Sequence, residues 1–196
     1  YVWEEVAEAA WDNVFGGGVW WTDDHTHSTP ACHGYKNAIT NELFFFLSSE
    51  LALAFPANTT YAWYTRHAAA WLVDDSGLLQ PDNHYLLNDG LSCRTGQNNG
   101  DTTWTYNQGV ILGGLANAAR VLGNATLQAV AERIADGAMT ALVDAAGVLS
   151  EACAIRTPDH AVHASVHTQA PSHCADSPSD RVFKGVFARY LPYVAT

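Results

Sequence analysis

Residues 37–55 read NAITNELFFFLSSELALAF, and this stretch decides the fold class. Its apolar residues point to nearly every side of a helix, and they are Ile39, Leu43, Phe44, Phe46, Leu47 and Leu51. A helix on a protein surface has one polar face, whereas a helix that is apolar all round is buried between neighbours. We therefore expect an inner helix over residues 37–55.

Helical periodicity continues on both sides of this segment. Apolar residues recur at helical spacing over residues 2–15, 61–74, 107–122, 127–143 and 181–194. Hardly any run alternates apolar and polar residues, as a half-buried strand would, so the fold class is all-α. Segments that are apolar all round alternate with segments that carry one apolar stripe. This alternation predicts two layers, as in a toroid of helical hairpins, within a single domain of residues 1–196.

The composition excludes several classes of protein. A hydrophobic fraction of 48% with only 15% charged residues is typical of a folded globular chain. No apolar run reaches the roughly 18 residues of a membrane-spanning helix, so we expect no membrane insertion. The net charge of −11 would repel the phosphates of nucleic acid and an anionic membrane surface. Binding of a neutral ligand is not excluded by the composition. Seven Trp and eight Tyr favour a sugar, because the apolar faces of a sugar stack on aromatic rings.

Two features of the sequence favour a secreted protein. The chain begins at Tyr1 without an initiator Met or an apolar signal segment, as a mature or truncated product does. Two N-glycosylation sequons, at Asn58 and Asn124, each lie in a polar break between helical segments.

The cysteines agree with an oxidising location. The chain has four of them and no Cys-x-x-Cys pair, so we expect disulfides rather than a zinc site. The expected pairs are Cys153 with Cys174, which bracket a single excursion of the chain, and Cys32 with Cys93.

Five short sequence blocks at loops and helix starts follow one another in a fixed order. They are GGGVWW at 16–21, YKNAITNELF at 35–44, NDGL at 88–91, TWTYNQG at 103–109 and FKGVFARYL at 183–191. In this order, with helix-length spacers, they resemble glycoside hydrolase family 76 over nearly the whole chain. The resemblance implies an (α/α)6 barrel and a secreted, extracellular or cell-wall location. It also implies α-mannan or a related polysaccharide as the partner, because known members are endo-acting α-1,6-mannanases and related fungal cell-wall proteins.

Polar and aromatic residues of these blocks are our candidates for substrate binding. Amides and carboxylates beside aromatic rings supply the hydrogen bonds and the stacking that sugar rings need. Polar residues at helix starts also serve as caps, and Lys36 and Glu42 can pair internally instead of binding a ligand. The candidates are Trp20, Trp21, Asn37, Asn41, Asp89, Trp104, Tyr106, Asn107 and Gln108.

The catalytic acids are the point at which the sequence departs from the family. Glycosidases normally use two carboxylates, and in family 76 these are adjacent aspartates upstream of the helix that precedes the glycine-tryptophan block. That position falls before Tyr1, so we assign no catalytic residue. The pair Asp23-Asp24 lies in a later loop, so it matches the family's pair in composition but not in place. Asp74-Asp75 is most simply a solvated helix end.

The length of the chain leaves two forms of the protein open. A closed ring of twelve helices needs roughly 250 residues or more, so this chain carries about half of such a ring. Either an N-terminal segment is missing, or the protein is a reduced relative that covers its inner helices by self-association. Its function is then either hydrolysis or transfer of α-1,6-linked mannose chains, with this chain supplying a cleft wall, or a non-catalytic structural or sugar-binding role.

The histidines offer a metal site as a rival hypothesis. One group shares a loop with Asp23-Asp24, and a second group has the spacing of one helix face. A polar surface insertion between Cys153 and Cys174 explains the second group more simply, so we expect no metal and no cofactor. The histidines concerned are His25, His27, His33, His160, His163, His167 and His173.

Overall fold

The computed structural model describes residues 2–22, 34–152 and 178–195, and helices dominate it. The helices are α1 (Val2–Ala9), α2 (Ala38–Ala54), α3 (Thr59–Ala70), α4 (Thr105–Leu122), α5 (Ala125–Ala141) and α6 (Pro178–Tyr190). Short helical turns are η1 (Val14–Gly16), η3 (Trp71–Asp75) and η6 (Leu191–Tyr193), and β1 (Leu79–Gln80) pairs antiparallel with β2 (Leu86–Leu87). The all-α prediction is confirmed, with one small hairpin that the sequence did not predict.

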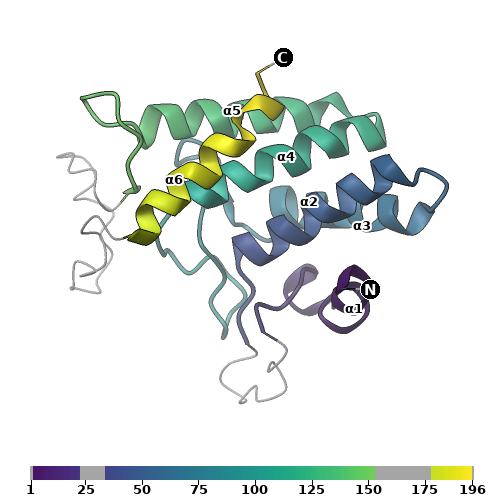
Figure 1. Cartoon of the computed structure of the whole chain (residues 1–196). Coiled ribbons are helices and arrows are strands. Elements are labelled where there is room, and N and C mark those ends of the chain that lie inside the picture. The colour runs from purple at the N-terminus through teal and green to yellow at the C-terminus, as the bar shows by residue number, and fades with distance from the viewer. Residues whose placement is uncertain (1, 23–33, 153–177, 196) are drawn as a thin grey trace.

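Two layers of helices are visible in Figure 1, with α2, α4 and α6 in one layer and α3 and α5 behind them. Helices α2 and α4 run in the same direction. Near their C-terminal ends, Asn117 of α4 donates to Glu50 of α2 at 2.6 Å. At their N-terminal ends, Ala38 and Tyr106 both donate hydrogen bonds to Asp89. This parallel inner layer is what a toroid of helical hairpins requires.

Several helix ends follow from local capping. Asn37, Asn58 and Asn124 are the N-caps of α2, α3 and α5, and each side-chain oxygen accepts a backbone N–H at 3.1–3.2 Å. Gly123 ends α4 with a φ of +61°, a conformation that glycine adopts without the strain of a Cβ. The helices predicted over residues 37–55, 107–122 and 127–143 begin and end within two residues of α2, α4 and α5.

The first helix is shorter than the predicted span of residues 2–15, because α1 ends at Ala9. The chain then turns back, and the Trp20 N–H donates to the Ala10 C=O at 3.2 Å. Asp12 breaks the helix since one carboxylate oxygen accepts the Val14 N–H at 3.0 Å and the Lys36 ammonium at 2.6 Å. Periodicity along the chain cannot show a partner that lies so far away in sequence.

The glycine block that follows α1 passes directly over a buried tryptophan. A Cβ on Gly18 would lie 2.9 Å from the Trp71 ring, and the φ of Gly18 is +87°. Trp71 is 1% exposed, and its Nε1 donates to the Phe15 C=O at 3.0 Å. The glycines thus let the loop pack closely on Asn41 of α2 and Trp71 of η3.

Several predictions fall outside the described residues or stay untested. Cys93 is disulfide-bonded, but its predicted partner Cys32 and the pair Cys153 and Cys174 lie outside the described ranges, so both pairings stay predictions. Asp23-Asp24 and the histidines of the metal hypothesis lie outside them too. Within the described ranges, no three His, Cys, Asp or Glu residues gather as metal ligands. Among the same residues, no helix is both long and apolar enough to cross a membrane.

Candidate functional site

The N-terminal ends of α2 and α4 meet at Asp89. Its C=O accepts the Ala38 N–H at 2.8 Å, which ties it to the first turn of α2. Its carboxylate accepts a hydrogen bond from the Tyr35 hydroxyl and another, 3.3 Å long, from the Tyr106 hydroxyl. Only glycine fits at Gly90, because a Cβ there would lie 2.3 Å from the Tyr35 hydroxyl oxygen. One carboxylate with two phenol donors therefore forms the centre of the site.

Aromatic rings lie on both sides of this centre. Trp21 is 59% exposed, and its ring centroid lies 6.1 Å from that of Tyr35 in an edge-on arrangement. On the other side, the Phe183 ring of α6 lies 4.4 Å from the Tyr106 ring and 5.7 Å from the Trp104 ring. Apolar ring faces beside hydrogen-bonding groups are suited to binding pyranose rings.

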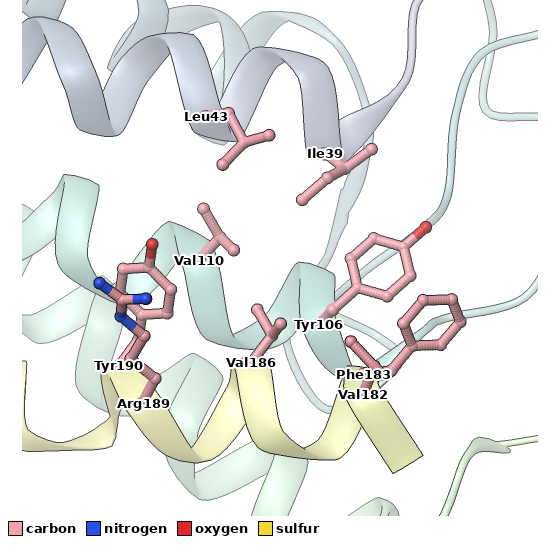
Figure 2. A pocket seen from close by; sticks show the side chains of 9 residues that line it. All are labelled: Ile39, Leu43, Tyr106, Val110, Val182, Phe183, Val186, Arg189 and Tyr190. Atoms are coloured by element: carbon pink, nitrogen blue, oxygen red, sulfur yellow. The ribbon is translucent and has the colours of Figure 1, made fainter. Parts of the chain in front are cut away.

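A groove of about 360 Å³ leads from these rings along the inner helices. Figure 2 shows Ile39 and Leu43 of α2 facing Val110 of α4 and Val186 of α6, with Tyr106 and Phe183 at one end. The groove is therefore apolar along its length and polar only near its ends. Its lining residues are Ile39, Leu43, Tyr106, Val110, Val182, Phe183, Val186, Arg189 and Tyr190.

Both phenols at the centre are held in the protonated form. Burial raises the pKa of Tyr35, and the hydrogen bond to Asp89 and the charge of Asp89 raise it further. Burial likewise raises the pKa of Tyr106, and the charge of Asp89 and the hydrogen bond to Asp89 add to this shift. Both hydroxyls therefore stay hydrogen-bond donors to Asp89 at neutral pH.

Glu42 lies fully buried in α2 close to this charge. Neither carboxyl oxygen has a hydrogen-bond partner among the described residues, so the internal pairing that the sequence left open for Glu42 is not found there. Burial raises the pKa of Glu42 well above its ordinary value of 4.5, and the negative charge of Asp89 raises it further. The neutral form of Glu42 is therefore favoured.

Lys36 does pair internally, and it organises the loop that carries Trp20 and Trp21. Its ammonium donates to Asp12 at 2.6 Å, to the Gly17 C=O at 2.7 Å and to the Val14 C=O at 2.8 Å. It also lies 4.5 Å from the centre of the Trp20 ring. Burial lowers the pKa of Lys36, and the Asp12 carboxylate opposes that shift.

Four of the predicted binding residues make contacts within the protein rather than line the groove. Trp20 is 5% exposed and donates to Asp12 at 2.8 Å. Asn37 caps α2, and Asn41 bonds to both the N–H and the C=O of Val19. The Gln108 amide bonds in the same two-sided way to Leu87, at 2.7 and 2.9 Å. These contacts hold the site in place. The predicted residues that lie at the site itself are Trp21, Asp89, Trp104 and Tyr106.

Asn107 is a further predicted residue, and it stands apart from the others. It is fully buried at the start of α4, and neither its amide oxygen nor its nitrogen has a hydrogen-bond partner among the described residues. The start of α4 is held instead by Glu151, whose carboxylate accepts the Thr105 N–H at 2.8 Å and the Thr105 hydroxyl. The structure thus gives no ligand-facing surface to Asn107.

Two residues of the site were missed by sequence reasoning. Tyr35 precedes the inner helix and Phe183 lies in the last block of the family resemblance, so both were within the quoted motifs. Their aromatic character was the available signal, but their place beside Asp89 and Tyr106 comes from contacts between distant segments.

The described residues thus define a class of protein: a two-layer array of helical hairpins with an aromatic-carboxylate site at the N-terminal ends of its inner helices. The chain belongs to glycosyl hydrolase family 76, whose model matches residues 1–196. Among curated relatives, the mannan endo-1,6-alpha-mannosidase DFG5 of Saccharomyces cerevisiae is 34% identical over 110 residues, which cover 54% of this chain and 22% of that protein.

Solved structures share the fold at low sequence identity. The Lin0763 protein from Listeria innocua superimposes with a TM-score of 0.73 at 22% identity, over 98% of this chain and 46% of its own. An inactive variant of the alpha-1,6-mannanase GH76A of Salegentibacter sp. HEL1_6, in complex with alpha-1,6-mannotetrose, gives 0.69 at 21% identity, over 96% of this chain and 46% of its own. This chain therefore spans less than half the length of these relatives and has the architecture of half of an (α/α)6 toroid.

Proposed function

We propose that the chain is part of an α-mannan-directed glycoside hydrolase or transglycosylase that acts on α-1,6-linked mannose chains, and that residues 1–196 supply one wall of its cleft. Membership of family 76 supports this proposal. It is also supported by curated relatives named as mannan endo-1,6-alpha-mannosidases and by the alpha-1,6-mannotetrose complex of one structural relative.

The observation that carries the proposal is the arrangement of side chains around Asp89. A neutral hexose needs hydrogen bonds to its hydroxyls and a flat apolar surface for its ring. Asp89 with Tyr35 and Tyr106 supplies the first, and Trp21 and Phe183 supply the second. A negatively charged site does not repel such a ligand, because mannose chains are uncharged.

The catalytic acids belong to another part of the complete gene product in this proposal. The described residues offer one adjacent aspartate pair, Asp74-Asp75, and both side chains are exposed at the end of η3. Bond cleavage needs two carboxylates placed on either side of a glycosidic oxygen and anomeric carbon. The remaining helices of the ring would bring that pair to the cleft wall described above.

We also propose a secreted or cell-wall location, with disulfides Cys32–Cys93 and Cys153–Cys174 and N-glycans on Asn58 and Asn124. Both asparagines lie exposed at helix N-caps, where a transferase has access. The disulfide-bonded state of Cys93 agrees with an oxidising compartment.

Incubation of the complete gene product with α-1,6-mannotetraose tests the activity. Shorter products analysed by mass spectrometry would indicate hydrolysis, and longer products would indicate transfer. Asp89→Asn keeps the shape of the side chain but removes its charge. We expect it to lower kcat/KM by about tenfold to a hundredfold, as loss of a charge-assisted hydrogen bond does.

Asp136→Asn is the matched control, because Asp136 is exposed on the outer helix α5. It should keep the parent rate. Absence of any product from α-1,6-linked substrates, together with activity on another glycan, would overturn the proposed substrate.

A further inference from the structure

The turn between α2 and α3 brings an exposed phenylalanine next to a glycosylation sequon. Residues 55–58 form a turn in which the Asn58 N–H donates to the Phe55 C=O at 2.9 Å. Pro56 and Ala57 occupy its two central positions. Phe55 is 57% exposed, and its nearest aromatic neighbour, Tyr61, lies 6.3 Å away in a tilted arrangement. A large apolar side chain is thus uncovered three residues before Asn58.

The Asn58 side chain is ready for modification at its nitrogen. Its Oδ1 accepts the Thr60 N–H at 3.1 Å, so the oxygen is engaged by the backbone of the sequon itself. Its Nδ2 donates to none of the described residues, and the side chain is exposed. The amide nitrogen therefore belongs to an exposed side chain three residues after the exposed Phe55.

We propose that Asn58 carries an N-linked glycan whose first N-acetylglucosamine lies against Phe55 and covers it. The inference rests on the secreted location proposed above. In the transfer step, Nδ2 loses a proton and bonds to the anomeric carbon of a lipid-linked, pyrophosphate-activated oligosaccharide, and the lipid pyrophosphate leaves. The apolar face of the sugar then removes part of the Phe55 ring from water.

Asn124 provides an internal comparison. It also caps a helix, and its Oδ1 also accepts the N–H of the sequon threonine, Thr126, at 3.1 Å. The residue three positions earlier is Val121, which is half-buried and has no ring for a sugar to cover. Both sites can be glycosylated, but only the glycan on Asn58 gains an aromatic contact.

Both sequons lie away from the candidate site. Asn58 and Asn124 follow the C-terminal ends of α2 and α4, whereas Asp89 joins the N-terminal ends of these two helices. Helix α2 has 17 residues, so the two ends are roughly 25 Å apart. Glycans at this end would leave the aromatic-carboxylate site around Asp89 accessible to a polysaccharide.

Site occupancy is the first test, on the complete gene product secreted from a yeast host. Trypsin separates the sequons, because Asn58 falls in residues 37–66 and Asn124 in residues 121–133. We expect both peptides to carry hexosamine. Occupancy of Asn124 with a bare Asn58 would overturn this inference alone, and bare peptides at both positions would overturn the proposed location as well.

Thermal unfolding of trimmed glycoforms is the second test. An endoglycosidase that leaves one N-acetylglucosamine should keep the Tm of the native glycoprotein. Loss of the glycan in Asn58→Gln should lower the Tm by about 2 °C. Phe55→Ala should remove this glycan-dependent difference, and Asn124→Gln should show no such dependence on Phe55. An Asn58 glycan effect that is the same with and without Phe55 would exclude the contact.

Discussion

Asp89 and Glu42 are two carboxyl groups of one site that differ in their hydrogen-bond partners. Asp89 accepts hydrogen bonds from two phenols, whereas the buried Glu42 has no hydrogen-bond partner among the described residues. A buried carboxylate without donors is unfavourable, and a negative neighbour makes it more so. Burial without hydrogen-bond donors therefore favours the neutral form of Glu42.

The raised pKa of Glu42 leads to a prediction about stability and pH. Below about pH 4.5, Glu42 is protonated in both the folded and the unfolded chain, so it costs nothing. As the pH rises above this value, the unfolded chain loses the proton and the folded chain keeps it, so the free energy of unfolding falls. Glu42→Gln removes this titration and should raise the Tm at pH 7 relative to the parent protein.

The measurement is the difference in Tm between the variant and the parent at pH 4 and at pH 7. The variant's advantage should be larger at pH 7 than at pH 4. Glu132→Gln, a substitution on α5, serves as a control for the loss of one carboxyl group. An equal effect of Glu42→Gln at both pH values would mean that Glu42 ionises normally in the folded protein.

At the scale of elements, α4 is the helix on which the inner layer depends, and its glycines allow the close packing. A Cβ on Gly109 would lie 2.4 Å from the Cα of Phe187 in α6, and one on Gly114 would lie 2.5 Å from the Phe45 ring in α2. A backbone atom cannot move aside as a side-chain tip can. Gly109 thus sets the distance between α4 and α6.

We predict that Gly109→Ala destabilises the protein by about 1–3 kcal/mol, as overpacking of a core does. Alanine would otherwise favour a helix over glycine by about 1 kcal/mol. Gly185→Ala on α6 measures the gain in helix propensity alone, because a Cβ at Gly185 would meet nothing within 4 Å. Urea unfolding should therefore show opposite signs for the two substitutions. Stabilisation by both would show that α4 and α6 are free to separate.

The sequence could predict elements better than their connections. The apolar pattern of residues 37–55 predicts α2, because a buried helix must be apolar all round. An asparagine directly before a helical segment also predicts an N-cap, as Asn37 is for α2. The end of α1 could not be read, because the contact of Asp12 with Lys36 links distant segments. The same reason applies to the site: polar residues at helix starts were recognised, but only packing distinguishes Asn41, which holds Val19, from Tyr106, which faces the groove.

For the whole molecule, the inner layer leaves an apolar face uncovered by the described residues. Leu43 and Leu47 of α2 are 50% and 43% exposed, and Val182 of α6 is 62% exposed. The groove of Figure 2 lies on this face. Apolar surface of this kind usually marks an interface. Structural relatives that share this fold are about twice as long as this chain.

We predict that this face is covered in the complete gene product, by its remaining helices or by a second copy of the chain. Val182→Lys should then destabilise the complete protein by more than about 2 kcal/mol, because an unpaired ammonium would be buried. Met139→Lys on the outer helix α5 is the control. Met139 is 52% exposed, so its substitution should change the free energy of unfolding by no more than about 0.5 kcal/mol.

Dependence of the unfolding midpoint on protein concentration distinguishes the two ways of covering the face. A second copy makes the midpoint rise with concentration, since association is part of folding, whereas helices of the same chain leave it constant. Residues 1–196 expressed alone should bind a hydrophobic dye or associate in either case. A small and equal effect of Val182→Lys and Met139→Lys, with a monomer that binds no dye, would show that this half of the ring is stable with its inner face in water.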